Sequence, residues 1–269
     1  MLYNVEQMPV TPEDVEQFDL TYFLDISNRL TAERAESQFR ENLKLLNKFR
    51  PVDSGFRILE IGPGIGWFQV NCLRNGVDCE GLELSPQCVE RARELGERYG
   101  VQPKVRLGNI ENTDIGESQY DAIVAESVLE HLPNWKEAVQ KIYAALKPEG
   151  VFYFSSSNKF AFVSGEFRRI PLYGWFPDKV RRWIRTTVEG PGVLLWYMDC
   201  NQFRYPFLRK FLGQVGFRDI FDYIEMKDPD DLNNPTRTRR FAAKILKSSK
   251  LAKRLCLTFW PTTVFLCRK

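Results

Sequence analysis

The feature that most constrains this chain is a glycine-rich turn that follows a short apolar run. Residues 57–61 read Arg-Ile-Leu-Glu-Ile, and three glycines then follow at alternate positions, Gly62, Gly64 and Gly66. Glycine lets the backbone turn sharply and lets a ligand approach the N–H groups, because no Cβ is in the way. The pattern therefore predicts a strand, a tight turn and a helix N-terminus that together bind a nucleotide.

The spacing of the glycines indicates which nucleotide is bound. A dinucleotide site usually reads Gly-x-Gly-x-x-Gly and holds a pyrophosphate at the helix N-terminus. Here the third glycine comes one residue early, and Glu60 suits an ammonium group better than a phosphate. The order Glu60-x-Gly62-x-Gly64-x-Gly66 resembles motif I of the class I S-adenosylmethionine (SAM) dependent methyltransferases. The resemblance implies that these four residues hold the methionine end of SAM, with S-adenosylhomocysteine (SAH) as the product.

Two further strand ends complete the expected cofactor site. A strand predicted over residues 78–84 ends near Glu83, where an acid can accept hydrogen bonds from both ribose hydroxyls of an adenosine ligand. We therefore expect Glu83 and Leu84 to line the ribose. The strand predicted over 104–107 leads into Asn109 and Ile110, which the resemblance assigns to the adenine. Family members often carry Asp at the Asn109 position, but Asn can also accept, through its side-chain oxygen.

The segment after the fourth predicted strand, 120–125, carries the candidate catalytic residues. It reads Val-Leu-Glu-His over 128–131 and resembles the corresponding segment of small-molecule methyltransferases such as those of ubiquinone synthesis. Some relatives bind a divalent metal through Glu-x-x-Glu-His, but Ser127 replaces the first acid, so we expect no metal. His131, the only histidine, is the first candidate for a general base, and the alternative is a helix residue bonded to nearby backbone. Asp199 and Glu126 are the other candidates, and Glu126 also counts as a cofactor residue.

Strand-like and helix-like segments alternate along the chain and predict an α/β fold. We expect a doubly wound, seven-stranded Rossmann-like sheet with helices on both faces. The resemblance implies that the last strand, near 262–267, runs antiparallel. A fifth strand is expected at 151–156 after a helix over 135–146, and a sixth up to about residue 225.

One domain is expected over residues 1–269. It would comprise a helical cap (1–50), a SAM-binding core (51–158), an insertion (159–200) and a C-terminal part (201–269) with a basic helical insertion at 232–258. The 159–200 insertion is rich in aromatic and basic residues, and it follows a strand whose carboxyl end faces the methyl donor, so it should build the acceptor pocket. The alternative is a small satellite core with a solvated basic rim.

Charge is distributed unevenly along the chain. Residues 232–269 contain ten Lys and Arg and no acid, whereas the whole chain has a formal charge of only +3. Within 237–258 a helical wheel separates an apolar side from a basic side, which fits either peripheral contact with an anionic membrane or packing of the apolar side on the sheet. No apolar stretch is long enough to span a membrane, and the N-terminal residues are too polar for a signal peptide.

Composition and motifs narrow the function. The six cysteines form no Cys-x-x-Cys pair, and together with the hydrophobic content of 43% they predict a cytoplasmic globular protein with reduced thiols. We expect methyl transfer to a small-molecule or lipid-linked acceptor in a biosynthetic pathway, and we expect the methylated atom to be a hydroxyl oxygen rather than a nitrogen or a carbon. One alternative is a nucleic-acid methyltransferase, which the absence of an Asn-Pro-Pro-Tyr motif disfavours, so no nucleic-acid partner is expected. The other is a non-catalytic SAM-binding subunit or membrane-surface adaptor.

Overall fold

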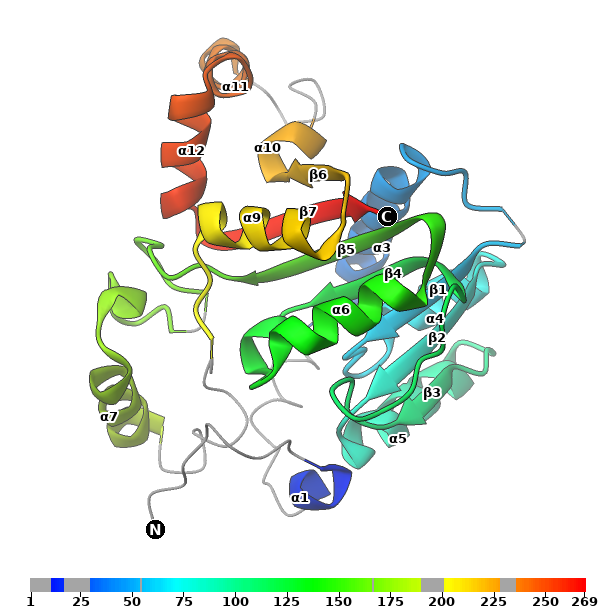
Figure 1. The fold of residues 1–269 in the computed structure, drawn as a ribbon. Coiled ribbons are helices and arrows are strands. Elements are labelled where there is room, and N and C mark those ends of the chain that lie inside the picture. The colour runs from blue at the N-terminus through cyan, green and yellow to red at the C-terminus, as the bar shows by residue number, and fades with distance from the viewer. Residues whose placement is uncertain (1–10, 17–29, 54, 166, 190–200, 228–235) are drawn as a thin grey trace. The chain divides into compact units, whose positions relative to one another are not determined.

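The computed structural model describes residues 11–16, 30–53, 55–165, 167–189, 201–227 and 236–269 (Figure 1). The chain forms two compact units. The first comprises Met1–Val128, Leu132–Phe152 and Lys269, and the second comprises Leu129–His131 and Tyr153–Arg268. The boundary between the units falls within a single strand, between Phe152 and Tyr153. The single domain expected from the sequence stays a prediction.

Seven strands form one sheet in the order β3-β2-β1-β4-β5-β7-β6. β1, β2, β3 and β4 run parallel, while β6 and β7 pair antiparallel. The predicted α/β sheet with an antiparallel last strand is therefore confirmed. The bounds of the strands are β1 Arg57–Ile61, β2 Asp78–Glu83, β3 Lys104–Leu107, β4 Tyr120–Glu126, β5 Leu146–Ser157, β6 Asp219–Asp222 and β7 Thr262–Arg268.

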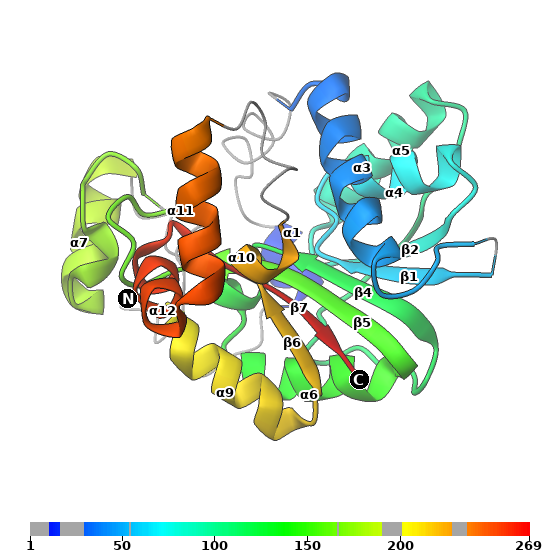
Figure 2. The ribbon, with the colours of Figure 1, turned by 90° about the horizontal axis from the view of Figure 1, so that it is seen from above.

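The helices of the first unit cover both faces of its strands. In Figure 2, α3, α4 and α5 lie together on one face and α6 lies on the other. Thr31 caps α3 by accepting from the N–H of Arg34, and Ser85 caps α5 by accepting from that of Cys88, as expected for Ser and Thr before a helix. The bounds are α1 Pro12–Glu16, α3 Ala32–Asn47, α4 Trp67–Arg74, α5 Pro86–Arg98 and α6 Trp135–Ala145.

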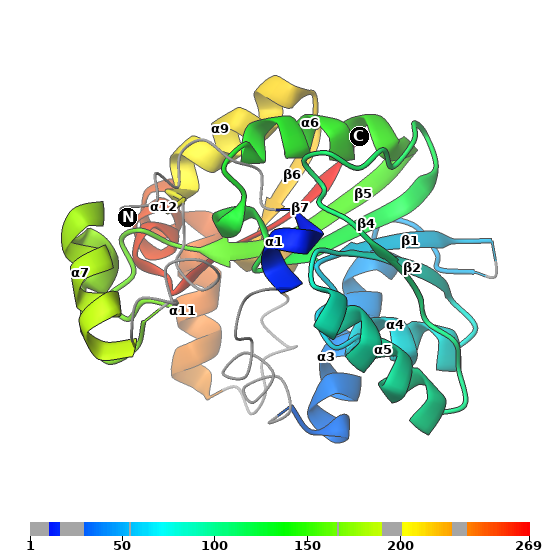
Figure 3. The same ribbon diagram turned by 90° about the horizontal axis from the view of Figure 1, so that it is seen from below.

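The second unit carries the insertion and the basic C-terminal helices. Seen from below in Figure 3, α7, α11 and α12 lie toward the same side of this unit. α9 packs against β6 and against α12. The bounds are η1 Leu129–His131, η2 Tyr173–Trp175, α7 Asp178–Glu189, α9 Tyr205–Val215, α10 Tyr223–Met226, α11 Arg237–Ser248 and α12 Lys250–Phe259.

Three boundaries differ from the sequence prediction. β5 begins directly after α6 at Leu146 rather than at residue 151, and it contains a residue with a positive φ, Glu149, at 64°. β6 ends at Asp222 because this residue forms a capping box with Glu225 and starts α10. The single basic helix expected in 232–258 is divided into α11 and α12 at Ser249, whose side chain accepts from the N–H of Ala252 and begins a new helix.

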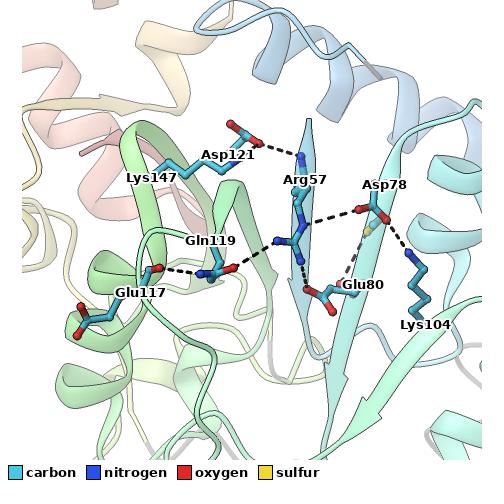
Figure 4. A network of polar contacts seen from close by, with 9 residues as sticks. Arg57, Asp78, Glu80, Lys104, Glu117, Gln119, Asp121 and Lys147 are labelled. Atoms are coloured by element: carbon cyan, nitrogen blue, oxygen red, sulfur yellow. Dashed lines mark hydrogen bonds and ion pairs between the residues drawn. The ribbon is translucent and has the colours of Figure 1, made fainter. Parts of the chain in front are cut away.

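A polar network joins residues near the beginnings of five strands, β1 to β5, in the first unit (Figure 4). Asp121 of β4 is fully buried and accepts from the N–H of Arg57 at 2.9 Å and from Lys147 Nζ at 2.7 Å. Burial alone would raise the pKa of Asp121, but hydrogen bonds from Lys147 and the Arg57 N–H, with the charges of Arg50 and Lys147, hold this pKa below its ordinary value. Arg57 also pairs with Asp78 and Glu80 of β2. The network lies at the amino ends of the strands, opposite the glycine turn, so we interpret it as structural.

Candidate functional site

The glycine turn adopts a backbone that other residues rarely adopt. Gly62, Gly64 and Gly66 have φ of 68°, 55° and 82°. A Cβ at Gly62 would lie 2.6 Å from Cγ2 of Val128, and one at Gly66 would lie 2.8 Å from Cβ of Ala92. The alternate glycines are therefore required both by the left-handed conformation and by close packing in the first unit.

Glu83 is tied to this turn. Its Oε2 atom accepts from the N–H of Gly64 at 2.9 Å, and its Oε1 atom accepts from the N–H of Ser85 at 2.9 Å. Burial raises the pKa of Glu83, and the N–H groups of Ser85 and Gly64 oppose that rise. The predicted ribose residue thus lies at the end of β2 beside the predicted methionine-binding turn.

Glu60, near the end of β1, has a buried oxygen to which the described residues offer no hydrogen bond. This atom is Oε2. Burial raises the pKa of Glu60 well above its ordinary value, and the charges of Glu126 and Glu83 raise it further. A cationic ligand beside Glu60 would remove both penalties, because it supplies an opposite charge and a hydrogen-bond donor.

Glu126 has a structural role that the sequence did not reveal. Its Oε1 atom accepts from Asn42 Nδ2 at 2.9 Å, and its Oε2 atom accepts from Gln38 Nε2 at 2.6 Å. Burial raises its pKa, and the bonds from Asn42 and Gln38 oppose the rise. Gln38 and Asn42 are four residues apart on α3, so they share a face, and this spacing of two amides was the available signal. Glu126 therefore joins β4 to the helical cap.

The candidate adenine residues lie after β3. Asn109 is buried, and its Oδ1 atom accepts from the N–H of Glu111 at 2.9 Å. Ile110 is also buried, and its carbonyl accepts from Lys141 Nζ at 2.9 Å. Leu84 follows β2 and is partly exposed. The Asn109 oxygen has a second lone pair that could accept from adenine. Adenine recognition by this side chain is a prediction.

The candidate catalytic residues are distributed unevenly. His131 ends the short helix η1 in the second unit, and its Nδ1 atom is buried without a hydrogen bond among the described residues. The expected alternative, a histidine bonded to nearby backbone, is therefore not observed for this atom. The preceding Glu130 is buried, and its carboxylate accepts a hydrogen bond from Ser156 Oγ at 2.5 Å. Its backbone carbonyl accepts from the N–H of Asn201. Asp199 lies outside the described residues.

The described part of the insertion forms a small core of its own. Phe167, Tyr173 and Ile184 are buried together, with Ile170 packed against them. The base of the insertion is closed, because the N–H of Lys159 donates to the carbonyl of Phe203 at 2.8 Å. A small satellite core is therefore present, but its rim is not wholly solvated, because Arg181 and Arg185 are buried. The acceptor-pocket interpretation stays a prediction.

The sheet order and the left-handed glycine turn beside Glu60 and Glu83 define the class I SAM-dependent methyltransferase fold. Residues 32–218, more than half of the chain, match the family model described as a methyltransferase domain. The chain belongs to the SAM-dependent methyltransferases. The buried, unpartnered Glu60 oxygen fits the cofactor of this family, because SAM carries both an ammonium and a sulfonium group.

Known proteins agree with this class. The chain is 29% identical over 142 residues to a ubiquinone biosynthesis O-methyltransferase of Methylocella silvestris, covering 51% of this chain and 54% of that protein. A protein of the same name from Pectobacterium carotovorum is 22% identical over 198 residues, covering 69% of this chain and 76% of its own length. The chain thus spans about half the length of the first of these relatives.

Solved structures with little sequence identity share the fold. A SAM-dependent methyltransferase from Archaeoglobus fulgidus aligns with a TM-score of 0.55 at 14% identity, covering 93% of this chain and all of the other. A phosphoethanolamine N-methyltransferase 2 of Haemonchus contortus, solved with SAM, aligns with a TM-score of 0.54 at 16% identity, covering 93% of this chain and 60% of that one. At these identities the likeness extends to the fold alone.

Proposed function

We propose that this protein transfers a methyl group from SAM to a hydroxyl oxygen of a small-molecule or lipid-linked acceptor in a biosynthetic pathway. The observation that carries the proposal is the buried Oε2 atom of Glu60 beside the left-handed glycine turn, because the described residues give it no hydrogen bond and a cationic ligand would supply both a donor and an opposite charge. The similarity to ubiquinone biosynthesis O-methyltransferases supports an oxygen acceptor.

Each cofactor residue has a proposed role. Glu60 and the turn at Gly62–Gly66 hold the methionine end, Glu83 and Leu84 the ribose, and Asn109 with Ile110 the adenine. When SAM binds, Glu83 can accept from ribose hydroxyls in addition to, or in place of, the N–H of Gly64, because each carboxylate oxygen has two lone pairs. SAM supplies an electrophilic methyl group on a sulfonium, and the protein aligns the acceptor and excludes water.

The acceptor hydroxyl needs a base, and His131 remains our first candidate. A neutral imidazole can take the hydroxyl proton as the methyl group transfers. Glu126 is a weaker candidate, since both its oxygens already accept hydrogen bonds from Asn42 and Gln38. Asp199 stays a candidate on sequence grounds only.

Two measurements test the proposal. Calorimetric titration with SAH should show binding, and absence of binding would overturn the cofactor site. Incubation with isotopically methyl-labelled SAM should then label catechols or other phenols, with and without an apolar tail, but not RNA or DNA. Labelling of nucleic acid alone would favour the nucleic-acid alternative, and SAH binding without transfer to any acceptor class would favour the non-catalytic one.

A further inference from the structure

Exposed apolar side chains are concentrated in the second unit. Among the described residues, thirteen of the fourteen large apolar side chains that are exposed belong to this unit, and only Leu107 belongs to the first. Contiguous exposed apolar surface in a folded protein marks a binding surface more often than chance placement does. The exposed apolar side chains of the second unit are therefore the first candidates for a binding surface of this protein.

The polarity of helix α7 is reversed relative to an ordinary surface helix. Arg181 and Arg185 are only 1% and 2% exposed, whereas Trp183 is 66% exposed and Val180 is 37% exposed. The two guanidinium groups lie over the rings of Tyr173 and Phe167, at 5.7 and 5.4 Å from the ring centroids. A helix that faces water normally buries its tryptophan and exposes its arginines. The exposed positions of α7 therefore combine the apolar side chains of Val180, Trp183 and Val188 with the charged Asp178 and Lys179.

Helices α11 and α12 show a related pattern. The exposed aliphatic residues Ile245, Leu251 and Leu255 are 43%, 69% and 52% exposed. Exposed cations alternate with them along both helices, and these are Lys244, Lys247, Lys250 and Arg254. Of the two interpretations of the helical wheel, packing of the apolar side on the sheet does not hold at Leu255, because Lys253 and Leu257 face inward instead: Lys253 pairs with Asp222 and Glu225, and Leu257 is 4% exposed.

An aromatic cluster connects α12 to the insertion. The ring of Phe259, at the end of α12, stacks on Phe162 at 5.3 Å and on Trp175 at 6.1 Å between centroids. Phe162 is 58% exposed and Trp175 is 43% exposed. In Figure 1, α12, the loop that leads into α7, and α7 itself follow one another along the left edge of the second unit. The elements that carry these apolar side chains thus lie along one edge of the second unit.

The charges indicate what kind of partner this edge binds. Lys179 and Arg182 of α7 flank Val180 and Trp183, and residues 232–269 contain no acid. Lysine is depleted at the centre of protein interfaces, whereas cations interleaved with apolar and aromatic side chains are typical of helices that lie in the headgroup region of a bilayer. A second copy of this edge would bring like charges together.

We propose that the second unit docks on an anionic lipid bilayer through α7, α11, α12 and the Phe162–Trp175–Phe259 cluster. Apolar side chains enter the headgroup boundary, and the Lys and Arg residues meet lipid phosphates. None of the described helices is long and apolar enough to cross a membrane, so the contact is made by a surface. The proposal does not depend on methyl transfer.

Flotation of the purified protein with vesicles tests this inference. The protein should float with vesicles that contain phosphatidylglycerol at low salt, float less at high salt, and stay unbound with pure phosphatidylcholine. Replacing Leu251→Ser and Leu255→Ser together should weaken binding about tenfold or more, because each leucine loses its apolar burial. Trp183→Ser should act in the same direction. Each of Lys244→Gln, Lys250→Gln and Arg254→Gln should weaken binding up to about fivefold.

Leu107→Ser is the matched control, since Leu107 is 47% exposed on β3 of the first unit. It should leave flotation unchanged. Thermal unfolding and SAH binding of every variant should resemble those of the original protein, because the replaced side chains are exposed. The proposal is overturned if anionic vesicles fail to bind the protein at low salt, if Leu107→Ser costs as much as Leu251→Ser with Leu255→Ser, or if sedimentation without lipid shows a dimer that these substitutions dissociate.

Discussion

The Oε2 atom of Glu83 lies 2.9 Å from the backbone nitrogen of Gly64 and accepts its hydrogen bond. The carboxylate at the end of β2 therefore also fixes the middle of the glycine turn that follows β1. Since the other oxygen of Glu83 accepts from the N–H of Ser85, one side chain connects the turn to the start of α5. The predicted ribose residue has a structural role even before a ligand binds.

The first prediction follows from that double role. Glu83→Ala should weaken SAH binding and lower the free energy of unfolding, each by about 1–3 kcal/mol, because two N–H groups lose their acceptor. Titration calorimetry and denaturant unfolding measure the two effects. Glu80→Ala, on the same strand but in a pair with Arg57 nearer the surface, should leave SAH affinity unchanged. Normal SAH affinity in Glu83→Ala would contradict the ribose assignment.

The second prediction concerns Glu60 and pH. Its pKa is raised in the folded protein, so the folded state holds a proton that the unfolded state has lost as pH rises above about 4.5. Stability should therefore fall with rising pH in the original protein, and Glu60→Gln should make that fall smaller, while Glu83 and Glu126, whose pKa values are also raised, still contribute to it. At neutral pH we expect the free energy of unfolding of Glu60→Gln to be about 1–2 kcal/mol higher than that of the original protein. The same variant should bind SAM more weakly, because it lacks the carboxylate. Thermal unfolding at several pH values, without ligand, provides the measurement. Equal pH dependence in both proteins would count against the interpretation.

The third prediction separates the structural role of Glu126 from a catalytic one. Asn42→Ala should lower the free energy of unfolding by about 1–3 kcal/mol, because it removes a donor from a buried carboxylate oxygen. If Glu126 only anchors α3, both Asn42→Ala and Glu126→Gln should keep near-normal turnover once folded. Arg40→Ala, which removes an exposed pair with Glu36 on the same helix, serves as the control and should barely change the melting temperature.

The fourth prediction concerns His131. If it is the base, His131→Ala should lower kcat roughly 100-fold while SAH affinity and the melting temperature stay the same. His131→Gln keeps a polar group of similar reach but cannot take the proton, so it should be equally slow. A loss of folding in both variants, or full activity in either, would point to the structural role instead.

The fifth prediction compares two neighbouring lysines of α12. Lys253 is paired with the buried carboxylate of Asp222 and with Glu225, whereas Lys250 is exposed. Lys253→Met should lower the free energy of unfolding by about 1–3 kcal/mol, because Asp222 loses a charged partner. Lys250→Met should change it by less than about 0.5 kcal/mol. Similar denaturation curves for the two variants would contradict this difference.

Local patterns predicted the positions of the strands and the class of the sheet, because each strand and the glycine turn are specified by adjacent residues. Gly62, Gly64 and Gly66 are examples. The two C-terminal helices show where such patterns fail. The helical wheel places Lys253 among the other cations of the basic side, but in the structure Lys253 faces inward because it pairs with Asp222, some thirty residues earlier in the chain. The anchoring of Glu126 by Asn42 likewise joins residues 84 positions apart.

The bonds of Asn158 have a consequence for exchanging parts between relatives. Asn158 Nδ2 donates to the carbonyls of Leu257, Thr258 and Trp260 at the end of α12. The insertion begins after Asn158 and ends before Phe203. At its base, Asn158 and Phe203 form an isolated parallel bridge, and the N–H of Lys159 donates to the carbonyl of Phe203. A chimaera that replaces only residues 160–202 would preserve both the bridge and the cap of α12, whereas a cut before Asn158 would remove the donor for three carbonyls. The backbone connections at the base of the insertion therefore lie at Lys159 and Phe203, but a replacement segment would also have to keep the contacts of Phe162 and Trp175 with Phe259.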